Sequence, residues 1–286
     1  MLTSYFPLSL SCGILGIPKK LSTLPQKSLY FTLGHSLHFF RFFFNQKRLL
    51  ALKPFPKNKR IYNDQRGVVT QAQASHIRGS SSSIRWLKRQ QSDPYTRMAR
   101  EQGFAARSAF KLDQILNSYH VTRAQLIIDL GASPGGWTQV LHRRFPCAHI
   151  ISVDKAPMTP IPNTTQLILD FTNTNTPRII GNILRDRKID LLVSDMAPSF
   201  CGHKQTDHIR LLALAELAFE FGKLTLKHGA NAIFKINRGG TESQFKLLLQ
   251  QYFERVCYAK PDASYKDSSE LFVVALGFIG RNRDDE

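Results

Sequence analysis

The chain has 286 residues, and 42% of them are hydrophobic, which is enough apolar material for a globular protein with a sizeable core. The formal net charge is +18, but residues 1–92 carry 15 Lys and Arg against one acid, whereas residues 93–286 carry 24 Lys and Arg against 20 acids. Most of the basic excess therefore lies in the N-terminal third. The four cysteines are scattered without a C-x-x-C pair, so we expect no disulfide framework and no metal centre.

The N-terminal segment, residues 1–83, has the composition of an organellar transit segment. Ten Lys and Arg, with Ser, Thr and Phe, precede its first acid, Asp64. This composition favours a mitochondrial presequence, while a chloroplast address and a membrane-surface patch at residues 39–44 stay open. Basic residues interrupt every apolar stretch, so no membrane span is expected. Residues 54–83 are polar and end in a serine run typical of a linker or disorder. We therefore predict a disordered segment 1–83 and one folded domain, 84–280.

The folded domain begins with two helical patterns and continues as alternating strands and helices. Asp93-Pro94 is typical of a helix start, with Asp as the cap and Pro in the first turn, and a second helix is expected over 106–118. Strands are expected at 126–130, 149–153, 166–169, 189–193, 231–234 and 271–278, with helices from Trp137 and at 177–186, 211–226 and 242–253. This alternation predicts an α/β fold with a parallel sheet and helices on both faces.

A glycine-rich turn, Gly131 to Gly136, joins the first of these strands to a helix that begins near Trp137. In an open α/β sheet, ligands bind just beyond the carboxyl ends of the strands. Glycines let a ligand approach the main chain, and a helix start offers N–H groups to an anion such as a carboxylate. An ordinary βα turn is the alternative interpretation. The glycine order is not G-x-G-x-x-G, so a dinucleotide fits poorly.

Charged residues stand at or next to the carboxyl ends of five predicted strands, namely Asp129, Asp154, Asp170, Asp195 and Lys235. Because such ends line one edge of the sheet, we expect these groups to converge on one crevice. One acid there is often only a helix cap, but five charged groups are hard to explain by capping. Asp154 has about the spacing from Gly131 that a ribose-binding acid shows, and Asp170-Phe171 pairs an acceptor with an aromatic face. S-adenosylmethionine fits these features better than NAD.

Five blocks in one order, at residues 107–112, 129–137, 194–198, 234–235 and 268–270, carry a family resemblance over residues 93–278. Together they resemble the FtsJ-type ribosomal RNA 2′-O-methyltransferases. Asp93-Pro94-Tyr95 and the preceding Trp86-Leu87 look most like the mitochondrial members.

The resemblance implies a Rossmann-like methyltransferase fold with a mostly parallel seven-stranded sheet, S-adenosylmethionine as cofactor and a Lys-Asp-Lys-Glu catalytic set. Matched block by block, that set is Lys111, Asp195, Lys235 and Glu270. The cofactor-binding positions of the family correspond here to Pro134, Gly135, Gly136, Trp137, Asp154, Asp170, Phe171 and Asp195. Gly131 is expected to serve the turn itself. The implied substrate is large-subunit ribosomal RNA, with a uridine of the peptidyl-transferase region as target. The transit-like start points to the mitochondrial ribosome.

The chemistry of this set follows from the acidity of the groups. A ribose 2′-hydroxyl is a weak acid and must lose its proton as it attacks. A neutral lysine could accept the proton, but a free lysine has a pKa of about 10.4 and is charged at neutral pH. A nearby cation and removal from water favour the neutral amine. We expect Lys111 to favour the neutral form of Lys235, which would serve as the base for the hydroxyl or as the group that orients it. Asp195 would hold the lysines and face the cofactor methyl, and Glu270 would position Lys111 and the ribose.

The C-terminal part departs from the family pattern in places that bear on RNA binding. Members commonly carry arginines just before the Glu block, where this chain has Tyr265 and Asp267 with only Lys266 basic, and Phe272 stands where a tyrosine is common. The remaining candidates for phosphate contacts are Arg85, Lys88, Arg89, Arg97, Arg100, Arg107 and Arg238. We expect recognition of a structured target by shape and 2′-hydroxyl contacts, within an assembling large ribosomal subunit.

The loop 198–206 is a candidate mobile lid, because it contains Gly202, His203 and Lys204. His203 invites assignment as a catalytic base, although a histidine in a solvated loop is the more common case.

Two rival functions stay open on the sequence. A ribosome assembly factor would need the RNA contacts more than the catalytic set, and a methyltransferase acting on transfer RNA or messenger RNA caps would use similar residues. The aromatic pair that cap binding requires is not evident in the sequence. No oligomer is implied.

Overall fold

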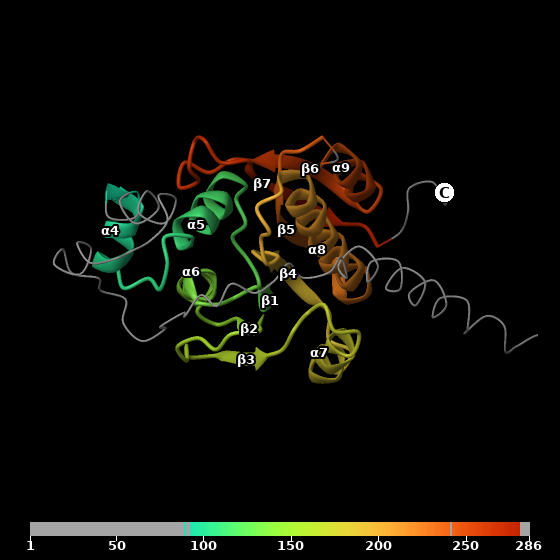
Figure 1. Cartoon of the computed structure of the whole chain (residues 1–286). Helices are drawn as coiled ribbons and strands as arrows, with labels where there is room; N and C mark the ends of the chain where they lie inside the picture. The colour runs from blue at the N-terminus through green and yellow to red at the C-terminus, as the bar shows by residue number, and fades with distance from the viewer. Residues whose placement is uncertain (1–88, 90–91, 241, 281–286) are drawn as a thin grey trace, which may run out of the picture. The chain divides into compact units, whose positions relative to one another are not determined.

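The computed structural model describes residues 89, 92–240 and 242–280 (Figure 1). The predictions for residues 1–83, Arg85 and Lys88 lie outside these residues. The strands are β1 Leu126–Leu130, β2 His149–Asp154, β3 Thr164–Ile168, β4 Ile189–Ser194, β5 Leu226–Asn237, β6 Phe253–Ala259 and β7 Glu270–Phe278. The helices of the described residues are α4 Pro94–Glu101, α5 Ala109–Ser118, α6 Gly136–Arg144, α7 Thr176–Leu184, α8 Lys204–Thr225 and α9 Glu242–Gln250.

The seven strands form one sheet in the order β3-β2-β1-β4-β5-β7-β6. Neighbouring pairs from β3 to β5 are parallel, and β7 runs antiparallel to both of its neighbours, β5 and β6. The predicted α/β fold and the mostly parallel seven-stranded sheet are thereby confirmed. The order reverses at β1, so the carboxyl ends of β1 and β4 meet at the switch point where open α/β sheets bind ligands.

Helices cover both faces of the sheet, with α5 and α6 on one side and α7, α8 and α9 on the other (Figure 1). All five residues of β1 are buried, as expected of a central parallel strand with both faces covered. On the α5 and α6 side, Leu112 and Ile115 pack with Leu141 over Ile127 and Ile233. Each such side chain contributes about 1.5 to 3 kcal/mol by its burial, so this layer fixes α5 firmly against the sheet.

The start of α4 follows the predicted capping. The Asp93 carboxylate accepts hydrogen bonds from the Thr96 N–H at 2.8 Å and the Thr96 hydroxyl at 2.6 Å, with Pro94 in the first turn. Among the described residues, no helix is long and apolar enough to cross a membrane.

Several element boundaries differ from the sequence prediction, and the largest differences concern the start of α8, the start of β5 and the segment after α9. Helix α8 begins at Lys204 rather than near residue 211, so the last three residues of the expected lid, 204–206, lie in its first turn. The predicted helix 242–253 ends at Gln250, and β6 follows it, although no strand was predicted there from the pattern alone. In β6 the buried residues Phe253, Val256 and Ala259 recur every third position. The strand therefore lacks the two-residue alternation by which strands are recognised.

Candidate active site

The first lysine–carboxylate pair lies at the ends of β4 and β5. Ser194, the last residue of β4, is in register with Phe234, which places Asp195 beside Lys235. The Lys235 ammonium lies 2.8 Å from Asp195 Oδ1 and donates a hydrogen bond to the Asp195 main-chain oxygen at 2.6 Å. The side chains are only 12% and 17% exposed, so this ion pair is largely shielded from water.

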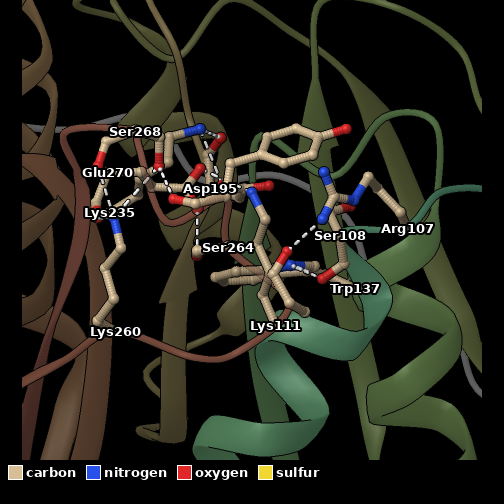
Figure 2. A network of polar contacts seen from close by, with 12 residues as sticks. Arg107, Ser108, Lys111, Trp137, Asp195, Lys235, Lys260, Ser264, Ser268 and Glu270 are labelled. Carbon is tan, nitrogen blue, oxygen red and sulfur yellow. Dashed lines mark hydrogen bonds and ion pairs between the residues drawn. The ribbon is translucent and has the colours of Figure 1, made fainter. Parts of the chain in front are cut away.

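The second pair joins α5 to the start of β7. Lys111 donates to Glu270 Oε2 at 2.7 Å, and the Ser264 hydroxyl donates to Glu270 Oε1 at 2.6 Å. Burial alone would raise the pKa of Glu270, but Lys111, the Ser264 hydroxyl and Lys235 together hold that pKa below its ordinary value. Glu270 is thus an anion that pairs directly with Lys111 and is stabilised at longer range by the charge of Lys235. Figure 2 shows Lys111, Asp195, Lys235 and Glu270 gathered in one network, as the sequence led us to expect.

Sheet register explains why these residues share one face. Glu270 is directly opposite Asn237 on the antiparallel partner β5, and Lys235 is opposite Phe272. Because strand side chains alternate, Lys235 and Glu270 point to the same face as Phe272. Phe272 belongs to the core layer under α5 and α6, so Lys111 of α5 reaches over that same face.

Trp137 fixes the helix that carries Lys111. Its indole N–H donates to the Ser108 main-chain oxygen at 3.0 Å, which also accepts from the Lys111 N–H at 3.0 Å (Figure 2). The indole is 2% exposed and lies 5.8 Å from the Phe272 ring, centre to centre. Trp137 was predicted as a cofactor-binding residue; in the structure its side chain belongs to the core and braces the start of α5.

The glycine-rich turn lies tightly against the end of β4. Gly131 has φ +78°, and a Cβ built there would lie 2.6 Å from the main-chain nitrogen of Met196. Gly135 has φ +115° and caps α6, whereas Pro134 is exposed and Gly136 is buried. Asp154 accepts from the Ser133 N–H at 3.0 Å and the Ala156 N–H at 2.9 Å, so it organises this turn from β2. The predicted role of Gly131 in the turn itself agrees with this close approach.

Asp129 is the buried acid of the site. Its side chain is fully buried in β1, and Oδ2 accepts from the Thr138 hydroxyl at 2.6 Å. Burial raises the pKa of Asp129 to about 7; the Thr138 bond opposes this, and the charges of Asp195 and Asp154 add to it. Oδ1 has no hydrogen-bond partner among the described residues. The sequence placed Asp129 at the converging strand ends but not among the binding residues.

The raised pKa makes the stability of the protein without ligand depend on pH. In the unfolded chain Asp129 should titrate near its ordinary value of about 3.9. The stabilisation from burying the neutral carboxyl is therefore complete below about pH 4. It is lost as the pH rises to about 7, because the folded protein must then bury a charged carboxylate. Between pH 4 and pH 8 the free energy of unfolding of the wild type should fall by on the order of 3 kcal/mol because of this group. The Asp129→Asn protein, which keeps an acceptor for Thr138, should lack this fall. Urea unfolding at both pH values measures this, and equal pH slopes in the two proteins would contradict it.

Asp170 and Phe171 have different surroundings. Hydrogen bonds from Thr172 and the charge of Lys155, 3.7 Å away, outweigh the effect of burial and lower the pKa of Asp170. Asp170 is exposed, as a residue that meets a ligand would be. Phe171 is 4% exposed and packs edge-on against Phe221, so the aromatic surface expected there is buried in the structure.

The acids at the strand ends fit a cofactor that carries positive charge. Asp129, Asp154 and Asp195 lie close enough that the latter two raise the pKa of the first, and one buried carboxylate oxygen of Asp129 has no protein donor. A pyrophosphate would be repelled here, whereas the ammonium and sulfonium of S-adenosylmethionine would be attracted. No group of three or more potential metal ligands occurs among the described residues.

Two of the predicted RNA-contacting arginines are engaged by the protein itself. Arg107 is ion-paired with Asp93 at 3.0 Å and donates to the Ala263 main-chain oxygen at 2.6 Å, while its guanidinium stacks 3.7 Å from the centre of the Tyr265 ring. Arg89 pairs with Asp267 at 2.6 Å. The residues that replace the family's arginines thus bind arginines of this chain. Arg97, Arg100 and Arg238 are exposed.

The expected lid is held at the base of α8. Asp207 accepts from the Cys201 and Gly202 N–H groups at 2.9 Å each. His203 caps α8, with Nδ1 facing the Thr206 N–H and hydroxyl, so its place in the fold is that of a helix cap.

A doubly covered sheet with a glycine-rich β1–α6 turn and acids at the strand ends defines a Rossmann-like methyltransferase. The model of the FtsJ-like methyltransferase family matches residues 104–278. The chain is 41% identical over 203 residues to "Ribosomal RNA large subunit methyltransferase E" of Novosphingobium aromaticivorans, covering 71% of this chain and 91% of that protein. The protein of the same name from Granulibacter bethesdensis is 42% identical over 214 residues, with 74% and 92% covered.

Among solved structures, a ribosomal RNA methyltransferase of Plasmodium falciparum aligns with a TM-score of 0.56 and 29% identity, over 62% of this chain and all of that one. The chain therefore belongs to the FtsJ-like methyltransferase family. It is a methyltransferase that uses S-adenosylmethionine.

Proposed function

We propose that this enzyme methylates the 2′-hydroxyl of a ribose in large-subunit ribosomal RNA, in mitochondria, on a uridine of the peptidyl-transferase region. The observation that carries the ribose assignment is the pairing of Lys111 with Glu270 beside Lys235 with Asp195, because two amines and two carboxylates can hold one hydroxyl and its proton. Ribosomal RNA is supported by the names of the relatives. The uridine rests on the family resemblance, and the mitochondrial address rests on the basic composition of residues 1–83.

Each residue has a definable task in this proposal. S-adenosylmethionine, when bound, supplies a methyl group that is already activated on a sulfonium. Asp129, Asp154 and Asp170 would hold it beside the glycine-rich turn. Lys235 would hold the ribose hydroxyl and take its proton when the amine is neutral, and Asp195 orients Lys235 through two contacts. Correct alignment should carry much of the rate, with proton acceptance adding on the order of 10²–10⁴-fold.

Mapping of 2′-O-methyl groups on mitochondrial large-subunit RNA tests the substrate. Cells without the protein should lose methylation at one nucleotide, and the wild-type protein should restore it. If every site stays methylated, the proposed substrate is wrong. A Lys235→Ala protein separates catalysis from binding: it should leave the nucleotide unmethylated, and full rescue of ribosome assembly would favour the assembly-factor function.

The address is tested with residues 1–83 fused to a fluorescent protein. Accumulation in mitochondria supports the proposal, whereas accumulation in chloroplasts or retention in the cytosol would contradict it.

A further inference from the structure

The loop between β6 and β7, residues 260–269, reaches back to the carboxylate of Glu270. Ser264 lies in this loop and is 5% exposed. Its hydroxyl donates to Glu270 Oε1 at 2.6 Å, and Lys111 occupies Oε2 at 2.7 Å (Figure 2). With one donor on each oxygen, the plane of the carboxylate is fixed, and the direction from which Lys111 is held is fixed with it.

We propose that Ser264 is a positioning residue for methyl transfer, which acts through Glu270 to place the ammonium of Lys111. This inference deepens the proposed function and rests on it. Neither the catalytic set of the family resemblance nor the cofactor positions include Ser264.

Ser264 is held by the same helix that carries Lys111. The neighbouring Ala263 donates its N–H to Gln114 Oε1 of α5 at 2.9 Å, and its main-chain oxygen accepts from Arg107 at 2.6 Å. Arg107 also stacks on Tyr265, the next residue of the loop. Ala263 and Tyr265, which flank Ser264, are thus both held by residues of α5 or of the segment just before it. The hydroxyl and Lys111 therefore keep their separation, and Glu270 is clamped between them.

The charged groups facing Glu270 come from three elements. Lys111 approaches from α5, Lys235 from β5, and Lys260, just after β6, donates to the Glu270 main-chain oxygen at 3.0 Å. Removal of the Ser264 hydroxyl leaves all three lysines in place but frees Oε1. Because that hydroxyl helps to lower the pKa of Glu270, the pKa should rise without it, and the carboxylate should gain rotational freedom.

The test compares Ser264→Ala with Ser268→Ala in the full-length protein. Ser268 is in the same loop, but its hydroxyl donates to the Tyr265 main-chain oxygen at 2.8 Å and accepts from the Lys260 ammonium at 3.2 Å, so its partners are other than the Glu270 carboxylate. We expect Ser264→Ala to lower kcat about tenfold, the effect of losing one hydrogen bond to a charged group, with KM for S-adenosylmethionine changed less than twofold. In the Glu270→Gln background the same substitution should add no further loss.

A second readout needs no turnover. The 13Cδ resonance of Glu270, assigned by its disappearance in Glu270→Gln, should titrate at higher pH in Ser264→Ala than in the wild type or in Ser268→Ala. An unchanged titration, or a kcat loss that is fully additive with Glu270→Gln, would overturn the inference. If the wild-type protein failed to methylate ribose at all, the proposed function would fail, while the titration would still decide whether Ser264 governs Glu270.

Discussion

Replacing Lys235 by methionine should lower kcat for ribose methylation on the order of 10²–10⁴-fold, the range that loss of a positioned proton acceptor produces. Methionine is close to lysine in length and apolar, so the buried site should keep its packing while the amine that contacts Asp195 is lost. Binding of S-adenosylmethionine, followed by calorimetry, should change much less than kcat.

The matched control is Lys246→Met on α9, whose ammonium lies over the Tyr258 ring instead of in the catalytic network. It should keep wild-type turnover. Near-normal turnover of a folded Lys235→Met protein would refute the catalytic role assigned to this lysine.

Gly131→Ala should lower the free energy of unfolding by about 3 kcal/mol or more, at the large end of single substitutions, and should abolish measurable turnover. Two causes act together: the left-handed backbone at φ +78°, and a Cβ that would come within 3 Å of main-chain atoms of Asp195 and Met196. Because those atoms are backbone, they can move away only if the end of β4 shifts, and Asp195 would shift with it.

Gly103→Ala separates the two causes. Gly103 has a similar φ of +70°, but nothing lies within 4 Å of its Cβ position. Its substitution should cost only about 1 kcal/mol, the expense of the backbone conformation. Chemical denaturation of both variants measures the difference, and equal losses would show that the contact with β4 is unimportant.

The parts of this molecule that sequence pattern predicted best are those in which one local rule decides the outcome. Buried parallel strands such as β1 are continuous apolar runs, and the cap at Asp93 is set within one turn of chain. The gathering of Asp195 and Lys235 followed from one topological rule, that parallel strand ends share an edge. Lys111 and Glu270 could not be placed by that rule, since one comes from a helix and the other starts an antiparallel strand; the family resemblance supplied them.

Tertiary contacts decided the features that the sequence did not reveal. Strand β6 has no alternating pattern because it is buried at every third residue. The Phe171 ring was expected to offer a stacking surface, and Trp137 was matched to a cofactor position by the family resemblance. Both rings are buried, and only the packing of Phe221 and Phe272 against them shows this. Ser264 is one of many serines in the chain. Its contact with Glu270 depends on how the loop folds over α5, which has no local sequence signal.

Nucleoside analysis after a single reaction tests the central claim most directly. Purified protein, S-adenosylmethionine with a labelled methyl group and unmodified mitochondrial large-subunit RNA are incubated, and the RNA is digested to nucleosides and analysed by mass spectrometry. The proposed chemistry predicts the label on the ribose of one nucleoside, as a 2′-O-methyl group, and its absence with Lys235→Met. Label on a base, or equal ribose labelling by the variant, would contradict it.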